Sequence, residues 1–171
     1  MPTVRSYLGL AVALNVGGSG PGHAQEQPGG SRKPEVVVTI HATGTFVVKL
    51  SPQPTVSGLT GGNLSRMSLD KQFHGDLEAT SQGEMLAAGT GVKESAGYVA
   101  LERVTGTLHG RRGSFVLQHS GTMTRGAPSL SITVVPDSGT GELAGLRGKM
   151  TITIVDGKHS YDFEYAIAGT P

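Results

Sequence analysis

The sequence predicts an all-β protein, most simply a small closed antiparallel β-barrel of about eight strands. Short runs of β-branched or alternating apolar residues recur after residue 34, and turn-forming residues separate them. No stretch in this part of the chain has helical periodicity of useful length. Closing the sheet removes exposed strand edges, which favours a barrel over a β-sandwich for a Gly-rich chain with few edge-blocking charges.

The composition narrows the function classes. The 171 residues suffice for one domain with a single hydrophobic core, and the formal net charge is only +1. We therefore expect no nucleic-acid partner, because such proteins usually concentrate a basic excess on one face. The chain has no cysteine, which excludes disulfides, zinc–thiolate sites, iron–sulfur clusters and cysteine nucleophiles. His41, His74, His109 and His159 lack the spacing of a metal site, so we expect neither a metal nor a cofactor.

The N-terminus has the pattern of a secretory signal peptide over residues 1–24. One Arg precedes an apolar run, Tyr7–Val16, and the small residue Ala24 offers a cleavage point. The apolar run is too short to span a membrane, and no Cys follows it that could carry a lipid anchor. The alternative interpretation is a disordered leader, or a start codon upstream of the true one.

The domain organisation follows from this interpretation. Residues 25–34 are polar and contain Pro and Gly, which predicts a disordered linker, and residues 35–171 form the single β-barrel domain. The protein is expected to be secreted or periplasmic if the leader is a signal peptide, and cytoplasmic otherwise.

The expected strands are short and separated by turns. Asp156-Gly157 is the strongest two-residue turn signal, and His74-Gly75-Asp76 predicts a turn or bulge. Outside the central hairpin, the runs with strand character are Val36–Ile40, Thr45–Leu50, Leu64–Phe73 (with Met67, Leu69 and Phe73 on one face), Leu77–Ala79, Met85–Thr90, Leu130–Val135, Leu143–Leu146, Met150–Val155 and Tyr161–Ile167.

The clearest hairpin, Gly97–Met123, contains the densest group of residues that could do chemistry. A turn at His109–Gly113 would pair residues of equal parity and place Arg103 opposite His119 on the more apolar face, the candidate interior. A cation and an imidazole in apolar surroundings need a carboxylate partner, and Glu78 or Glu102 is the expected supplier. Such a group could hold an anionic or carbonyl ligand, or tune the imidazole as a general acid or base.

Two alternatives stay open for these residues. The Arg103–His119 pair could be a buried structural pair or could face outward near the rim, because a one-residue slip of register moves both side chains outside. Glu102, Gln118 and Tyr98 fall on the opposite face, which is typical of a solvated or inter-subunit surface. Glu78 lies on the polar side of its strand. The candidate ligand-binding residues are Arg103, His119, Glu78, Glu102, Gln118 and Tyr98.

Three long segments and the C-terminal run resemble a bacterial family known as domain of unknown function 3224. They are Met67–Leu86, Gly97–Met123, Ser131–Ile152 and the run DGKHSYDFEY, so the resemblance extends from about Thr43 to Tyr165. The resemblance implies an allene-oxide-cyclase-like β-barrel. It implies no activity, since the catalytic pattern of the cyclase cannot be placed on these residues. The leader at residues 1–34 departs from the usual layout of the family.

Three functions fit a barrel of this kind. The first is binding of a small apolar or amphipathic molecule in the lumen. The second is an isomerase or cyclase in which the cavity constrains the substrate, so that a strong catalytic motif is not required. The third is a structural or interaction protein with a packed core, whose outer face forms a homo-oligomer.

Overall fold

The computed structural model describes residues 39–54 and 63–168, which form a closed eight-stranded antiparallel barrel. This confirms the fold class expected from the strand pattern. The strands follow one another around the barrel in chain order, and β8 pairs with β1 to close it. They are β1 (Ile40–Gln53), β2 (Leu64–Gly75), β3 (Leu77–Gly89), β4 (Ala96–Leu108), β5 (Arg111–Thr124), β6 (Ala127–Val134), β7 (Leu146–Val155) and β8 (Lys158–Ile167).

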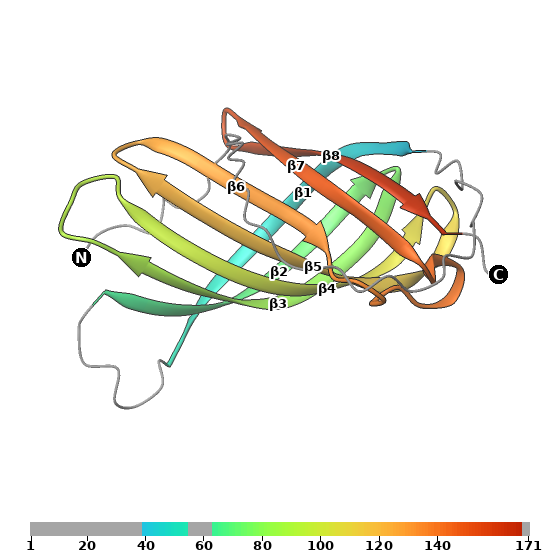
Figure 1. The fold of residues 1–171 in the computed structure, drawn as a ribbon, viewed down its shortest axis with the longest axis horizontal. Helices are drawn as coiled ribbons and strands as arrows, with labels where there is room; N and C mark the ends of the chain where they lie inside the picture. The colour runs from blue at the N-terminus through green and yellow to red at the C-terminus, as the bar shows by residue number, and fades with distance from the viewer. Residues whose placement is uncertain (1–38, 55–62, 169–171) are drawn as a thin grey trace, which may run out of the picture.

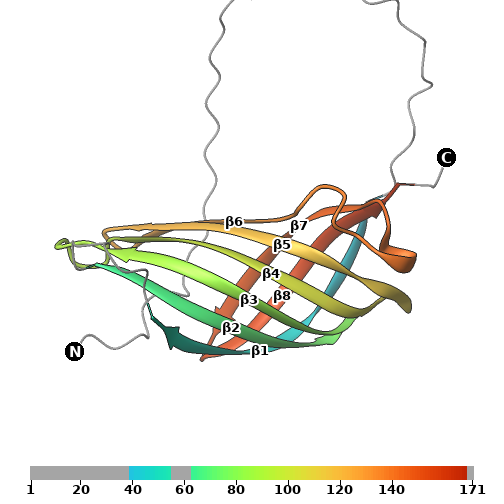
Figure 2. The ribbon, with the colours of Figure 1, turned by 90° about the horizontal axis from the view of Figure 1, so that it is seen from below.

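The barrel is uneven around its circumference. Strands β2 to β6 run side by side (Figure 1), and β7, β8 and β1 cross behind them in the view of Figure 2. Neighbouring strands pair over many residues except β6 and β7, whose described residues pair at Thr133 and Lys149 alone. β6 and β7 diverge from this point toward the end of the barrel that holds the β7–β8 turn (Figure 2).

Two-residue turns set the register of the hairpins. His109-Gly110 joins β4 to β5, and Asp156-Gly157 joins β7 to β8 as expected. Both residues of each turn have positive φ, between 46° and 78°, which matches a type I′ turn and the right-handed twist of the strands.

The expected pairing of the central hairpin is therefore wrong. The turn has two residues and not five, so Leu108 pairs with Arg111 and residues of opposite parity face one another. Arg103 pairs with Val116 on the outer surface, and His119 pairs with Ala100 on the inner one. Alternate residues of a strand point to opposite faces of the sheet. The observed register therefore places Glu102, and not Arg103, in the interior.

The strand boundaries also differ from expectation in three places. The runs Leu77–Ala79 and Met85–Thr90 are joined in one strand, β3, which ends at Gly89. β1 is one continuous strand that includes Pro52, whereas Val36–Val38 lie outside the described residues. Leu143–Leu146 is not a strand: a 3-10 turn, η2 (Gly141–Leu143), places Leu143 in the core, and β7 begins at Leu146. No helix in the described part of the chain is long and apolar enough to cross a membrane.

The interior contains two apolar clusters with a polar layer between them. The larger cluster, toward the η2 end, is built around Phe73, Phe115 and Phe163, and the smaller one around Met67, Leu69 and Met85. Along each of four neighbouring strands, a polar residue stands on the inward face where the two clusters meet. These residues, which we call the polar layer, are Lys71, Ser81, Glu102 and His119.

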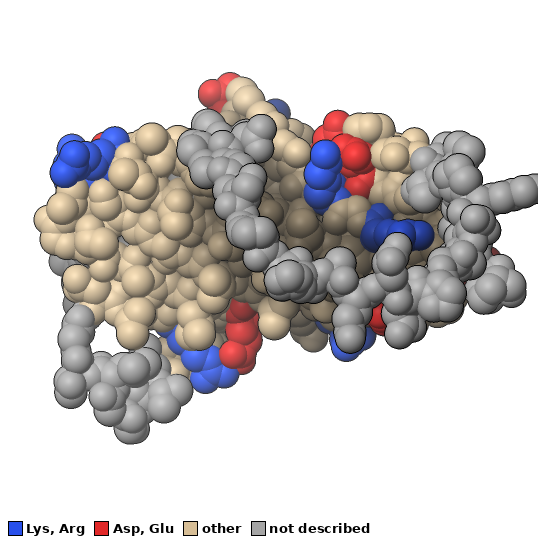
Figure 3. Space-filling model, viewed as in Figure 1, with Lys and Arg blue, Asp and Glu red and all other residues tan. Residues whose placement is uncertain are grey.

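The outer surface has a broad face with few charges. The side of the molecule formed by β3 to β6 is largely free of Lys, Arg, Asp and Glu in Figure 3. Leu86 on β3 and Val99 and Leu101 on β4 are each more than half exposed, and Leu86 pairs directly with Val99. Self-association through an outer face of the barrel stays a prediction.

Gly83 lets β3 and β4 approach closely beside the polar layer. It pairs with Glu102, and a Cβ at this position would overlap the carbonyl oxygen of Leu101 and lie 2.6 Å from Glu102 Cα. We expect Gly83→Ala to lower the free energy of unfolding by about 1–3 kcal/mol, as overpacking does. Gly91→Ala is the matched control, because no atom lies within 4 Å of its added methyl group. Urea unfolding of both variants tests this, and equal stability would contradict it.

Candidate functional site

The polar layer is organised around the carboxylate of Glu102, which is only 1% exposed. Its Oε1 accepts hydrogen bonds from Lys71 Nζ at 2.6 Å and from His119 Nε2 at 2.8 Å. Its Oε2 accepts one from Ser81 Oγ at 2.5 Å. Both oxygens are thus occupied, which satisfies the requirement that a buried charge be paired and hydrogen-bonded.

Four consecutive strands bring the layer together. Lys71 stands on β2, Ser81 on β3, Glu102 on β4 and His119 on β5, each at an inward position of its strand. Lys71 Nζ also lies 5.1 Å from the ring centroid of Phe46 and 5.7 Å from that of Phe73, so aromatic faces stabilise the ammonium.

The layer holds a defined set of charges. Burial alone would raise the pKa of Glu102, but the Lys71 ammonium and the hydrogen bonds from His119 and Lys71 outweigh it and lower the pKa to about 2. Burial and the nearby Lys71 charge lower the pKa of His119 despite its bond to Glu102. Near neutral pH, Glu102 is therefore a carboxylate and His119 a neutral imidazole.

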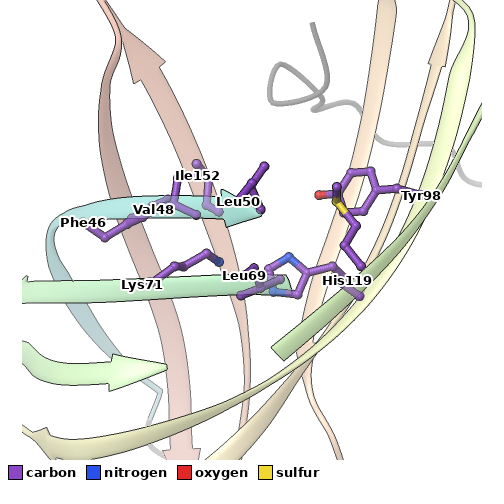
Figure 4. A pocket seen from close by; sticks show the side chains of 10 residues that line it. Phe46, Val48, Leu50, Leu69, Lys71, Tyr98, His119 and Ile152 are labelled. Carbon is purple, nitrogen blue, oxygen red and sulfur yellow. The ribbon is translucent and has the colours of Figure 1, made fainter. Parts of the chain in front are cut away.

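A small cavity of about 50 Å³ adjoins the polar layer (Figure 4). Lys71 and His119 point toward each other at its inner side, and Tyr98 presents its hydroxyl group from β4. Burial and the Glu102 charge raise the pKa of Tyr98 to about 12, so its hydroxyl keeps its proton. The remaining lining is apolar: Phe46, Val48, Leu50, Leu69, Met85, Ala100 and Ile152.

The structure brings only part of the expected candidate set together. Glu102, His119 and Tyr98 lie at or beside the cavity. Arg103 and Gln118 are exposed on the outer face, and Glu78 is exposed at the β2–β3 turn, where it accepts a hydrogen bond from the backbone of Gly75. A ligand-binding role for any of them stays a prediction.

Sequence reasoning missed Lys71 and Ser81. Lys71 has the same parity as Met67, Leu69 and Phe73, so a charged residue on an apolar strand face was the available signal. Ser81 likewise continues the face of Leu77 and Ala79. Their buried partner, Glu102, lies on a strand whose register depended on the length of the hairpin turn.

Removal of the Glu102 charge should destabilise the barrel strongly. Glu102→Gln leaves the Lys71 ammonium buried without its counter-charge, which we expect to cost about 3–5 kcal/mol of unfolding free energy. The double variant Lys71→Met/Glu102→Gln should recover part of this loss. Glu84→Gln, which breaks the exposed pair with Arg66, is the matched control and should change stability little. Urea unfolding at pH 7 tests this, and equal effects of E102Q and E84Q would refute it.

Acid should destabilise the protein partly through His119. The unfolded chain protonates an ordinary imidazole near pH 6.5, whereas the folded protein does so only at lower pH. The unfolded state therefore holds more protons in this window, and stability falls as pH decreases from about 6.5. The lowered pKa of Glu102 acts in the same direction below about pH 4.5.

Unfolding temperatures measured from pH 7.5 to pH 5 test the His119 contribution. The slope of unfolding temperature against pH should be shallower for His119→Gln than for the unchanged protein. It should be preserved in His41→Gln, which removes an exposed imidazole outside the polar layer. The ionisable groups facing His119 are Lys71, Glu102 and Tyr98, and all three remain in both variants. An unchanged slope in His119→Gln would contradict the assignment.

Comparison with known proteins places the chain in a family. The family model described as "Protein of unknown function (DUF3224)" matches residues 42–165, nearly the range of the resemblance found in the sequence. The chain is also similar to a crystal structure of a protein of unknown function from the DUF3224 family of Shewanella oneidensis MR-1. The two share 55% sequence identity with a TM-score of 0.72, over 77% of this chain and 99% of that one. No curated protein matches the chain. The chain belongs to the DUF3224 family.

Proposed function

We propose that the barrel binds a small amphipathic molecule in its lumen. The observation that carries the proposal is an ammonium and a neutral imidazole, both buried, that border a cavity otherwise lined mostly by apolar side chains. Ligand sites commonly combine an apolar lining with a few convergent polar groups. The polar end of the ligand would contact Lys71 and His119, while its apolar part would lie against Leu50, Met85 and Ile152.

The size of the cavity limits what its inner part can hold. A volume of about 50 Å³ is below the several hundred Å³ typical of sites that enclose a drug-sized molecule. Only the polar end of a ligand therefore fits beside the polar layer. Leu50 and Ile152 are half-buried, so the chain of the ligand would continue over them toward the end of the barrel that holds the β7–β8 turn.

The methionines offer a direct test of lumen binding. Met85 lines the cavity, whereas Met150 belongs to the apolar cluster toward η2. Titration of methyl-13C-methionine protein with 1-octanol should shift the Met85 methyl resonance in a saturable manner and leave Met150 nearly unchanged. This measurement uses the unaltered protein, so it does not depend on the folding of a variant.

A blocking variant supplies the control. Ala100→Leu adds three carbons inside the cavity without changing a polar group and should abolish the shift of the Met85 resonance by 1-octanol. Ala127→Leu on the exposed outer surface should leave this shift unchanged. Native mass spectrometry of the protein after incubation with a metabolite extract adds a search for the natural ligand. Absence of any saturable shift and of any retained molecule would overturn the proposal.

An isomerase is the second candidate, because a neutral imidazole beside an ammonium can act as a base next to an electrostatic partner. His119 would take a proton from the carbon next to a carbonyl group, the charge left on the carbonyl oxygen would be stabilised by Lys71, and the proton would return to another carbon. Incubation of the protein with 2-octanone in D2O separates the two candidates. Catalysed exchange of carbon-bound hydrogen supports the enzyme, and binding without exchange supports the binding module.

A further inference from the structure

The bonding of Glu102 fixes the protonation pattern of His119. Glu102 Oε1 accepts a hydrogen bond from the Lys71 ammonium, which can only donate, and Oε2 accepts one from the Ser81 hydroxyl. With both oxygens acting as acceptors, the contact between Oε1 and His119 Nε2 at 2.8 Å requires the proton to lie on Nε2. In a neutral imidazole the other nitrogen, Nδ1, then carries a lone pair and can only accept.

Among the described residues at the cavity, two polar atoms have no hydrogen-bond partner: His119 Nδ1 and the Tyr98 hydroxyl oxygen. His119 is only 4% exposed, yet its Nδ1 has no hydrogen-bond partner among the described residues. Every completely buried side-chain nitrogen or oxygen of the described residues has a partner, so Nδ1 keeps some exposure, and His119 lines the cavity. An acceptor that is nearly enclosed and left without a donor calls for a ligand or a water molecule that donates to it.

Lys71 supplies the complementary donor. One of its three N–H groups donates to Glu102, and Lys71 is among the residues that line the same cavity. Lys71 Nζ and His119 Nε2 contact the same carboxylate oxygen, and the Lys71 side chain points toward the His119 ring (Figure 4). The lining of the cavity therefore includes both a donor, Lys71, and an acceptor, His119.

The charge balance selects against ionic ligands. The Lys71 ammonium is already neutralised by Glu102, so an anionic head group would meet no net positive charge and would face the Nδ1 lone pair. A cationic head group would be repelled by Lys71. The head group that fits is neutral and presents one acceptor and one donor.

The volume of the cavity limits the head group to a few atoms. One water molecule needs about 10–15 Å³ of cavity volume. A cavity of about 50 Å³ therefore holds on the order of three to five non-hydrogen atoms. A primary carboxamide has three, with its acceptor and donor on adjacent bonds.

We propose that the cavity recognises a primary carboxamide, whose carbonyl oxygen accepts from Lys71 and whose N–H donates to His119 Nδ1. This inference rests on the proposed lumen binding and names the chemical class of its ligand. The aliphatic part of the molecule lies against the apolar lining, as in the proposed function.

A ligand series in which only the head group changes tests the inference on the unaltered protein. Octanamide, octanoate, octylamine and methyl octanoate share a similar chain length. We expect octanamide to bind about tenfold or more tightly than each of the others, since each of them leaves a buried partner unsatisfied or adds an unbalanced charge. Isothermal titration calorimetry at pH 7.5 measures the affinities.

The tautomer is measured independently of any ligand. In 15N NMR spectra of the imidazoles, His119 should show a protonated Nε2 and an unprotonated Nδ1, and octanamide should shift the Nδ1 resonance. A protonated Nδ1 in the free protein, or octanoate or methyl octanoate binding as tightly as octanamide, would overturn the carboxamide inference while leaving lumen binding intact. Failure of all four compounds and of 1-octanol to bind would overturn the proposed function itself.

Discussion

The carboxylate of Glu102 is the group on which the interior of this barrel depends. It holds Lys71 and His119 through one oxygen and Ser81 through the other, and so ties four consecutive strands together between two apolar clusters. An unpaired charge in this position would be costly, and the complete set of partners makes the arrangement stable. The same bonds orient the ammonium and the imidazole at the edge of the cavity.

The barrel itself determines which side chains reach that carboxylate. Two-residue turns with positive φ fix the hairpin registers, and the register of β4 against β5 decides whether Glu102 or Arg103 points inward. Gly83 adds a second constraint, because only a residue without a Cβ allows β4 to lie so close to β3 opposite Glu102. Local backbone geometry thus places the chemistry without any contiguous motif.

Much of the fold was predictable from the sequence, whereas the site was predictable only in part. The alternation of apolar residues and the turn at Asp156-Gly157 led to the closed barrel, because periodicity reports directly on which face is buried. The prediction of which residues of β4 point inward was wrong, because a turn of two residues in place of five reverses the parity of every cross-strand pair. Lys71 gave a weaker signal, because it is a single charged residue on an apolar strand face. Its partner Glu102 lies on another strand and reaches it only in the observed register.

The contents of the cavity test the account most directly. A high-resolution crystal structure of the protein grown with octanamide should show Lys71 and His119 both bonded to Glu102 Oε1, with the amide nitrogen within hydrogen-bond distance of His119 Nδ1. An interior closed by apolar side chains, with His119 Nδ1 bonded to another protein group and no space beside Lys71, would contradict it. That result would make the polar layer a structural element and leave the barrel without a lumen site.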